Sequence, residues 1–127
     1  NINNILKIKS NMDSGMFYPV QKGAIEALKQ ERKWFDDLNL IYAKRKKIVI
    51  QICKKLNLKF DKNNSGMFLW GKINESSISS EEFVDQLLYD KNIFITPGSI
   101  FGSNGEGYVR LSLCIKQEKL DEALNRL

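Results

Sequence analysis

Hydrophobic residues recur along this chain with helical spacing in some segments and with strand spacing in others. The longest helical pattern covers residues 34–56, where apolar side chains return every three or four positions and keep one face. Shorter patterns of the same kind cover residues 2–9, 20–28, 83–88 and 120–127. Residues 108–114 alternate strictly, so that one face of a predicted strand carries Val109, Leu111 and Leu113 and the other carries Tyr108, Arg110 and Ser112.

Short apolar runs predict further extended segments. Residues 65–71 are apolar on both faces, which is typical of a central strand, and residues 58–60 form a brief extended piece before them. Residues 93–96 are apolar and β-branched, and Pro97 ends this predicted strand. The segment from there to the last strand is a glycine-rich loop that contains Gly98, Gly102, Gly105 and Gly107.

Polar residues mark where two of the helices begin. Ser79 followed by Glu82 has the spacing of a capping box, so we expect a helix to begin there. Residues 10–15 form a polar turn cluster, in which Asp13 or Ser14 is placed to cap the next helix. Pro19 is acceptable only in the first turn of that helix.

Length and composition predict an ordinary globular domain. The chain has 127 residues, of which 43% are hydrophobic and 28% are charged. Its apolar runs are too short for a transmembrane helix, and its first residues lack a signal-peptide pattern, so no membrane partner is expected. The start at Asn1 without a methionine indicates a piece of a longer protein.

The cysteines predict a cytoplasmic protein without a metal site. Cys53 and Cys114 are far apart, have no Cys-x-x-Cys spacing and have no histidine to join them, which argues against zinc. Both lie in apolar contexts, so we expect buried free thiols. The absence of histidine also excludes Ser-His and Cys-His nucleophiles.

The formal charge of +5 is spread over the whole chain, so it does not indicate a nucleic-acid-binding site. The basic run Lys44-Arg45-Lys46-Lys47 lies in the longest predicted helix, where four consecutive side chains point in different directions, and we expect a solvated face. The aromatic residues have core spacing and do not interleave with the basic runs. An alternative function remains a non-enzymatic basic module that binds an acidic partner, and its binding would weaken steeply as salt rises.

One charged residue stands on the polar face of the last predicted strand. Arg110 is either a solvated side chain on a half-exposed strand or a planar donor fork that a rigid strand presents to a carboxylate. The spacing of the residues leaves both interpretations open.

The segment around this arginine resembles a known family. Residues 96–102, Thr-Pro-Gly-Ser-Ile-Phe-Gly, and residues 105–113, Gly-Glu-Gly-Tyr-Val-Arg-Leu-Ser-Leu, are similar to the C-terminal end of class I/II aminotransferases, the pyridoxal-phosphate enzymes of the aspartate aminotransferase fold. Residues 65–71 resemble the Gly-Gly-x-Phe-x-Trp strand of that family, with Ser65 in place of the first glycine. Met67, Phe68 and Trp70 of this segment are core candidates first, and a substrate-lining role for them is secondary. The resemblance implies that Arg110 binds the α-carboxylate of the substrate and that Phe101, with the Pro97-Gly98 turn, shapes the wall of the pocket.

The resemblance covers nearly the whole chain and implies its fold and domains. We expect an α+β class: the two-layer small domain of a pyridoxal-phosphate-dependent transferase, with helices packed on a short β-sheet and led by a long helix. Residues 1–30 correspond to the tail of the large, cofactor-binding domain and the interdomain segment. Residues 31–127 correspond to the C-terminal small domain.

The resemblance also implies a cofactor that this chain cannot anchor. The family holds pyridoxal 5′-phosphate on a lysine in a Ser-Lys-type motif. This sequence contains no such motif, since Lys9-Ser10 has the reverse order. The chain therefore carries no catalytic residue of its own, and we expect it to be inactive alone. The implied parent is a homodimer that transfers an amino group between an amino acid and a 2-oxo acid.

Overall fold

The computed structural model describes residues 1–12, 15–74 and 77–127, and the chain divides into two compact units, residues 1–37 and 38–127. The first unit contains α1 (Ile2–Met12), α2 (Tyr18–Leu28) and the beginning of α3 (Arg32–Lys55). No residue of α1 or α2 is buried within the chain. The assignment of residues 1–30 and 31–127 to two domains of a larger protein stays a prediction.

The end of α1 and the beginning of α2 agree only in part with the prediction from the sequence. The turn predicted over residues 10–15 is wrong at its start, because α1 continues through Met12. Asp13 and Ser14, the predicted caps, lie outside the described residues. The residue before α2 is Phe17, which makes no capping bond with its side chain, and proline occupies the first turn as expected.

The second unit is built on a four-stranded antiparallel sheet with the strand order β1-β2-β4-β3. The strands are β1 (Lys59–Phe60), β2 (Phe68–Lys72), β3 (Thr96–Pro97) and β4 (Tyr108–Ser112). The central position predicted for residues 65–71 is confirmed, since β2 pairs with β1 on one side and with β4 on the other. The alternation predicted for the last strand is also confirmed, because Val109 and Leu111 are buried while Tyr108 and Arg110 are only half-buried.

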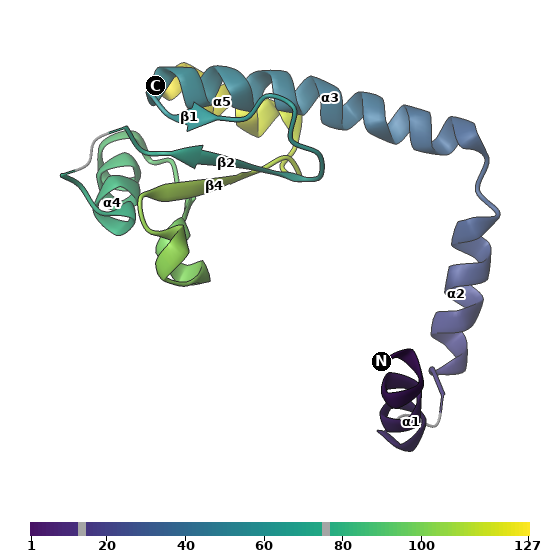
Figure 1. The fold of residues 1–127 in the computed structure, drawn as a ribbon. Helices are drawn as coiled ribbons and strands as arrows, with labels where there is room; N and C mark the ends of the chain where they lie inside the picture. Colours follow the sequence, from purple (N-terminus) through teal and green to yellow (C-terminus); the bar gives the residue numbers. More distant parts are fainter. Residues whose placement is uncertain (13–14, 75–76) are drawn as a thin grey trace. The chain divides into compact units, whose positions relative to one another are not determined.

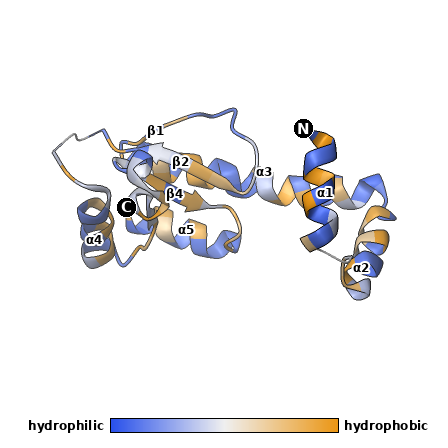
Figure 2. Cartoon of the chain, turned by 60° about the horizontal axis from the view of Figure 1, so that its bottom comes forward, coloured by the Kyte–Doolittle hydropathy of each residue, from blue (hydrophilic) through white to orange (hydrophobic). Residues whose placement is uncertain are grey.

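Helices cover one face of this sheet. Figure 1 shows α3 and α5 (Gln117–Arg126) on the same side of β2 and β4. Val49 and Ile52 of α3 pack with Leu120 of α5 in the core, and β2 and β4 are coloured as hydrophobic along much of their length in Figure 2. The α+β class predicted from the sequence is confirmed. Among the described residues, no helix combines the length and the apolar character that a membrane span requires.

The predicted capping box begins α4 (Ser80–Lys91). The Ser79 hydroxyl accepts a hydrogen bond from the Glu82 backbone N–H at 3.2 Å, and the Glu82 carboxylate accepts one from the Ser79 backbone N–H at 2.9 Å. The second bond holds the pKa of Glu82 below its ordinary value, because it stabilises the charged carboxylate. The capping box is therefore confirmed.

The strand predicted over residues 93–96 is wrong at its beginning. The side chains of Ile93 and Ile95 are buried in the core, but only Thr96 and Pro97 pair with β4. Proline is tolerated there because β3 is an edge strand, which forms backbone hydrogen bonds with a neighbouring strand on one side alone. The loop that follows contains two short 3₁₀ helices, η1 (Gly98–Phe101) and η2 (Ser103–Gly105).

Two predictions about surface chemistry are corrected. Cys53 is buried, but Cys114 is exposed, because it lies beyond the end of β4 and follows the buried Leu113, so that it falls on the side away from the core. In the basic run, Arg45 donates to the Leu113 carbonyl at 3.1 Å and Lys46 donates to the Asn64 carbonyl at 2.6 Å, so these two cations hold loops of their own unit.

Candidate functional site

The face of the sheet opposite α3 and α5 carries the candidate site. We call it the open face and define it by Phe68 and Trp70 of β2 and by Tyr108, Arg110 and Ser112 of β4. Alternation places these side chains together, because the buried neighbours Leu69, Val109 and Leu111 point to the core. Trp70 lies directly opposite Arg110 in the β2–β4 pairing and is 39% exposed. Phe101 of the 3₁₀ helix η1 contacts this face at Trp70 and Arg110, and the exposed part of Trp70 stays accessible to a ligand or to other protein.

Arg110 is the one charged group of β4, and two aromatic rings contact it. Its guanidinium carbon lies 4.1 Å from the ring centroid of Phe68 and 4.4 Å from that of Phe101. Among the described residues it makes no hydrogen bond or ion pair. Guanidinium groups stack on ring faces and keep their N–H donors available in their own plane. The arrangement can therefore present a donor fork to a planar anion such as a carboxylate.

The loop before β4 brings Phe101 to this arginine. Phe101 ends η1, and its ring meets the ring of Trp70 edge to face at 5.3 Å with an interplanar angle of 72°. The Ser99 hydroxyl donates a hydrogen bond to the Glu81 carboxylate of α4 at 3.2 Å, which ties η1 to that helix. The structure therefore brings together the two site residues that the sequence singles out, Arg110 and Phe101.

Sequence reasoning assigns Met67, Phe68 and Trp70 to the core first, and this is wrong for two of them. Met67 is 47% exposed and Trp70 is 39% exposed, since β2 has only one covered face. Phe68 is half-buried, and its ring lies against Arg110 instead of contributing to the buried cluster. The signal that finds Phe68 is the β2–β4 register: Phe68 pairs with Ser112, which makes it the diagonal neighbour of Arg110.

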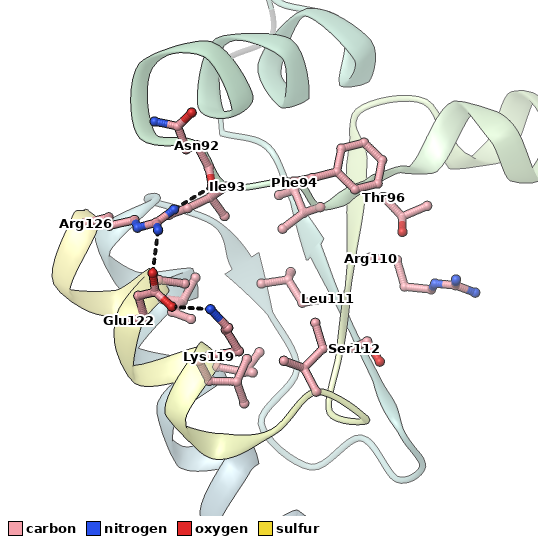
Figure 3. Close-up of a pocket in the computed structure, with 16 residues that line it drawn as sticks. Asn92, Ile93, Phe94, Thr96, Arg110, Leu111, Ser112, Lys119, Glu122 and Arg126 are labelled. Carbon is pink, nitrogen blue, oxygen red and sulfur yellow. Dashed lines mark hydrogen bonds and ion pairs between the residues drawn. The ribbon is translucent and has the colours of Figure 1, made fainter.

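A hollow of about 440 Å³ lies near this strand, and Arg110 is one of the residues that line it. Its floor is apolar, and Lys119, Glu122 and Arg126 of α5 form its charged rim. In Figure 3 the Arg110 side chain points away from these three residues. The rim charges are paired with one another, since Glu122 binds Lys119 at 2.8 Å and Arg126 at 2.5 Å. These bonds and charges lower the pKa of Glu122.

The groups on the open face suit a carboxylate and do not suit a whole cofactor. A pyridoxal-phosphate site needs a lysine to anchor the ring, an acid for its pyridine nitrogen and a helix N-terminus for its phosphate. Among the described residues, Arg110 is contacted by rings and by none of these groups, and the N-terminus of α4 is already bound by Glu82 and Glu106. The residues present do not make a cofactor site by themselves. The described residues also contain no cluster of three cysteine or acidic side chains that could ligate a metal.

Curated proteins of similar sequence are aminotransferases. The LL-diaminopimelate aminotransferase of Maridesulfovibrio salexigens is 40% identical over 121 residues, which cover 95% of this chain and 31% of that protein. The protein of the same name from Aquifex aeolicus is 38% identical over 121 residues, with the same coverage of 95% and 31%. The chain thus spans about 31% of the length of these relatives.

Solved structures agree with this finding. A probable N-succinyldiaminopimelate aminotransferase from Thermus thermophilus matches with a TM-score of 0.82 at 26% identity, over 98% of this chain and 33% of that one. Apo-BacF from Bacillus subtilis matches with a TM-score of 0.77 at 33% identity, over 98% and 32%. The family model for aminotransferases of class I and II matches residues 2–127, and the chain therefore belongs to the class I and II aminotransferase family.

Proposed function

We propose that this chain is the C-terminal substrate-recognition part of a pyridoxal-phosphate-dependent aminotransferase, which transfers an amino group between an amino acid and a 2-oxo acid. Residues 31–127 form its small domain, and residues 1–30 are the tail of its large domain and the interdomain segment. The rest of the parent protein supplies the cofactor and the lysine that holds it. The parent is a homodimer.

The observation that carries this proposal is the environment of Arg110. The guanidinium stands on a central strand, against two rings, with no acidic partner among the described residues. A cation left without an internal partner on an open face is suited to an external anion. Amino acids and 2-oxo acids share one group, the carboxylate next to the reacting carbon, and Arg110 binds this group in both substrates. Phe101 forms the wall of the pocket beside it.

Arg110→Lys in the complete enzyme tests this role. Lysine keeps the charge but cannot donate two parallel hydrogen bonds, so binding of both substrates weakens while the cofactor stays bound. Losing such a charge-assisted pair costs about 2–5 kcal/mol, which lowers kcat/KM by about thirtyfold to several thousandfold. Steady-state kinetics with LL-diaminopimelate, the substrate in the names of the relatives, and with the 2-oxo acid that the complete enzyme accepts measure the effect on both kinds of substrate.

Arg32→Lys is the matched control. Arg32 lies in α3 and pairs with Asp36 at 3.1 Å with its side chain 86% exposed, so the same exchange there leaves kcat/KM unchanged. Wild-type kcat/KM in Arg110→Lys for every substrate would show that Arg110 is an ordinary strand residue, and the assignment would be withdrawn.

A further inference from the structure

On the open face the ring of Phe68 lies 4.1 Å from the guanidinium carbon of Arg110, closer than the ring of Phe101. We propose that Phe68 is a positioning residue: its ring holds the Arg110 guanidinium in the orientation that receives a carboxylate. This inference rests on the carboxylate-binding role proposed for Arg110. Phe68 itself touches the arginine and is assigned no contact with the substrate.

Arg110 needs such a support because nothing polar fixes it. Arginine has several rotatable bonds, and ordering a side chain of this kind costs conformational entropy. In the described part of the chain no hydrogen bond or ion pair restrains the guanidinium, whereas Arg45 and Arg126 donate to the carbonyls of Leu113 and Asn92. The contacts that restrain Arg110 are those with the two rings, through cation–π attraction and stacking.

Phe68 is the better fixed of the two rings. It begins β2 in the middle of the sheet, where it pairs with Ser112 of β4. Its carbonyl accepts a hydrogen bond from the Asn64 side-chain amide at 2.7 Å, so the strand is held at this residue from both sides. Phe101 ends a short 3₁₀ turn and is 48% exposed. A rigid strand is the more precise mount for a site residue, and it carries Phe68.

The arrangement determines which kinetic constant Phe68 affects. If the ring is removed, the guanidinium is no longer held before the substrate arrives, and the cost of ordering it falls on binding. The bound carboxylate still meets the same two donors, so the step that follows is little altered. Loss of the ring therefore raises KM for all substrates that share the carboxylate and leaves kcat nearly unchanged.

Three variants separate positioning from packing. Phe68→Leu removes the ring and keeps apolar bulk, whereas Phe68→Tyr keeps an aromatic ring. Phe83→Leu makes the same exchange as Phe68→Leu at a half-buried residue of α4 that packs against the core. In the complete enzyme, Phe68→Leu raises the KM for LL-diaminopimelate by about tenfold. Phe68→Tyr returns KM to within about twofold of wild type, and Phe83→Leu leaves it unchanged.

The chain itself gives a second readout that needs no activity. Ring currents displace the Nε–H resonance of Arg110 in NMR spectra, and Arg110→Lys assigns that resonance by removing it. Phe68→Leu moves the signal toward those of the other arginines, and Phe83→Leu does not. An unmoved Arg110 signal in folded Phe68→Leu overturns the inference.

The kinetic outcomes distinguish this inference from the proposed function. If Arg110→Lys loses activity while Phe68→Leu keeps a wild-type KM, the carboxylate role stands and the positioning role of Phe68 is refuted. If both variants keep wild-type kinetics, the carboxylate role falls and the inference falls with it. Equal losses in Phe68→Leu and Phe83→Leu would reduce Phe68 to a packing residue and would also overturn the inference.

Discussion

The carboxylate of Glu106 accepts a hydrogen bond of 2.7 Å from the backbone N–H of Ser80, the first residue of α4. The same carboxylate oxygen accepts a second bond of 3.2 Å from the N–H of Gly107, and the Ser80 hydroxyl accepts a bond of 2.8 Å from that N–H. Glu106 thus satisfies a donor at a helix N-terminus and ties the loop before β4 to α4. The bond from Ser80 is the main reason that the pKa of Glu106 lies below its ordinary value of 4.5.

Glu106→Gln should make the second unit less stable at neutral pH and less sensitive to acid. Because folding lowers the pKa of Glu106, the stability it provides is present above the unfolded pKa and is lost as pH falls through the lower, folded pKa. Urea unfolding of both proteins at pH 7 and at stepwise lower pH measures this difference. The difference in unfolding free energy between wild type and Glu106→Gln becomes smaller as the pH falls below 4.5.

Asp85→Asn is the control for this prediction, since Asp85 is exposed on the same helix and its carboxylate makes no hydrogen bond or ion pair within the described residues. This variant keeps the wild-type pH profile. A constant gap between wild type and Glu106→Gln at every pH would mean that the lowered pKa does not contribute to folding stability.

Gly98→Ala should be strongly destabilising because two backbones meet at this residue. A Cβ atom on Gly98 would collide with the carbonyl oxygen of Gly105 and would lie 2.7 Å from that of Tyr108. Carbonyls of the main chain cannot move aside as the end of a side chain can, so we expect a loss of about 3 kcal/mol in unfolding free energy. The loop that carries Phe101 shifts with it. Chemical denaturation followed by tryptophan fluorescence gives the measurement.

Gly23→Ala provides the contrast. Gly23 lies inside α2, and a Cβ atom there meets nothing within 4 Å. Alanine favours helix over glycine by about 0.5–1 kcal/mol, so this exchange leaves the second unit as stable as before and increases the helix signal in circular dichroism. Equal midpoints for Gly98→Ala and wild type would contradict the close approach of the two loop segments.

Features set by neighbouring residues in the sequence could be predicted, and the capping box shows why. Ser79 and Glu82 are three residues apart, and both of their bonds form within one helical turn. The alternation in β4 likewise places Val109 in the core and Arg110 on the other face through backbone geometry alone. These local rules locate the arginine of the candidate site and the face on which it stands.

Features set by tertiary pairing could not be predicted. The contact between Phe68 and Arg110 depends on the register of β2 against β4, which no local pattern states. Ile93 and Ile95 have strand composition, but their burial comes from side-chain packing without a ladder. The local pattern wrongly places Lys46 in solvent. The carbonyl that Lys46 binds belongs to Asn64, in a loop that follows α3, and no pattern within the helix predicts that contact.

The two cysteines should differ sharply in reactivity. Cys53 is fully buried in α3, and desolvation raises the pKa of its thiol from 9.0 to about 12. A rise of this size lowers the fraction of reactive thiolate at pH 8 by about a thousandfold, and burial blocks the reagent as well. Cys114 is exposed, with its sulfur 3.8 Å from that of Met67. One thiol per chain should therefore react with Ellman's reagent rapidly and the other only as the second unit opens.

Single variants assign the two phases. Cys114→Ser removes the fast phase and leaves the slow one, whereas Cys53→Ala removes the slow phase. Because the slow phase requires Cys53 to become exposed, its rate rises with urea in step with unfolding of the second unit, and the fast phase does not change. Rapid reaction of both thiols in the folded chain, or a slow phase that persists in Cys53→Ala, would show that α3 does not keep Cys53 in the core.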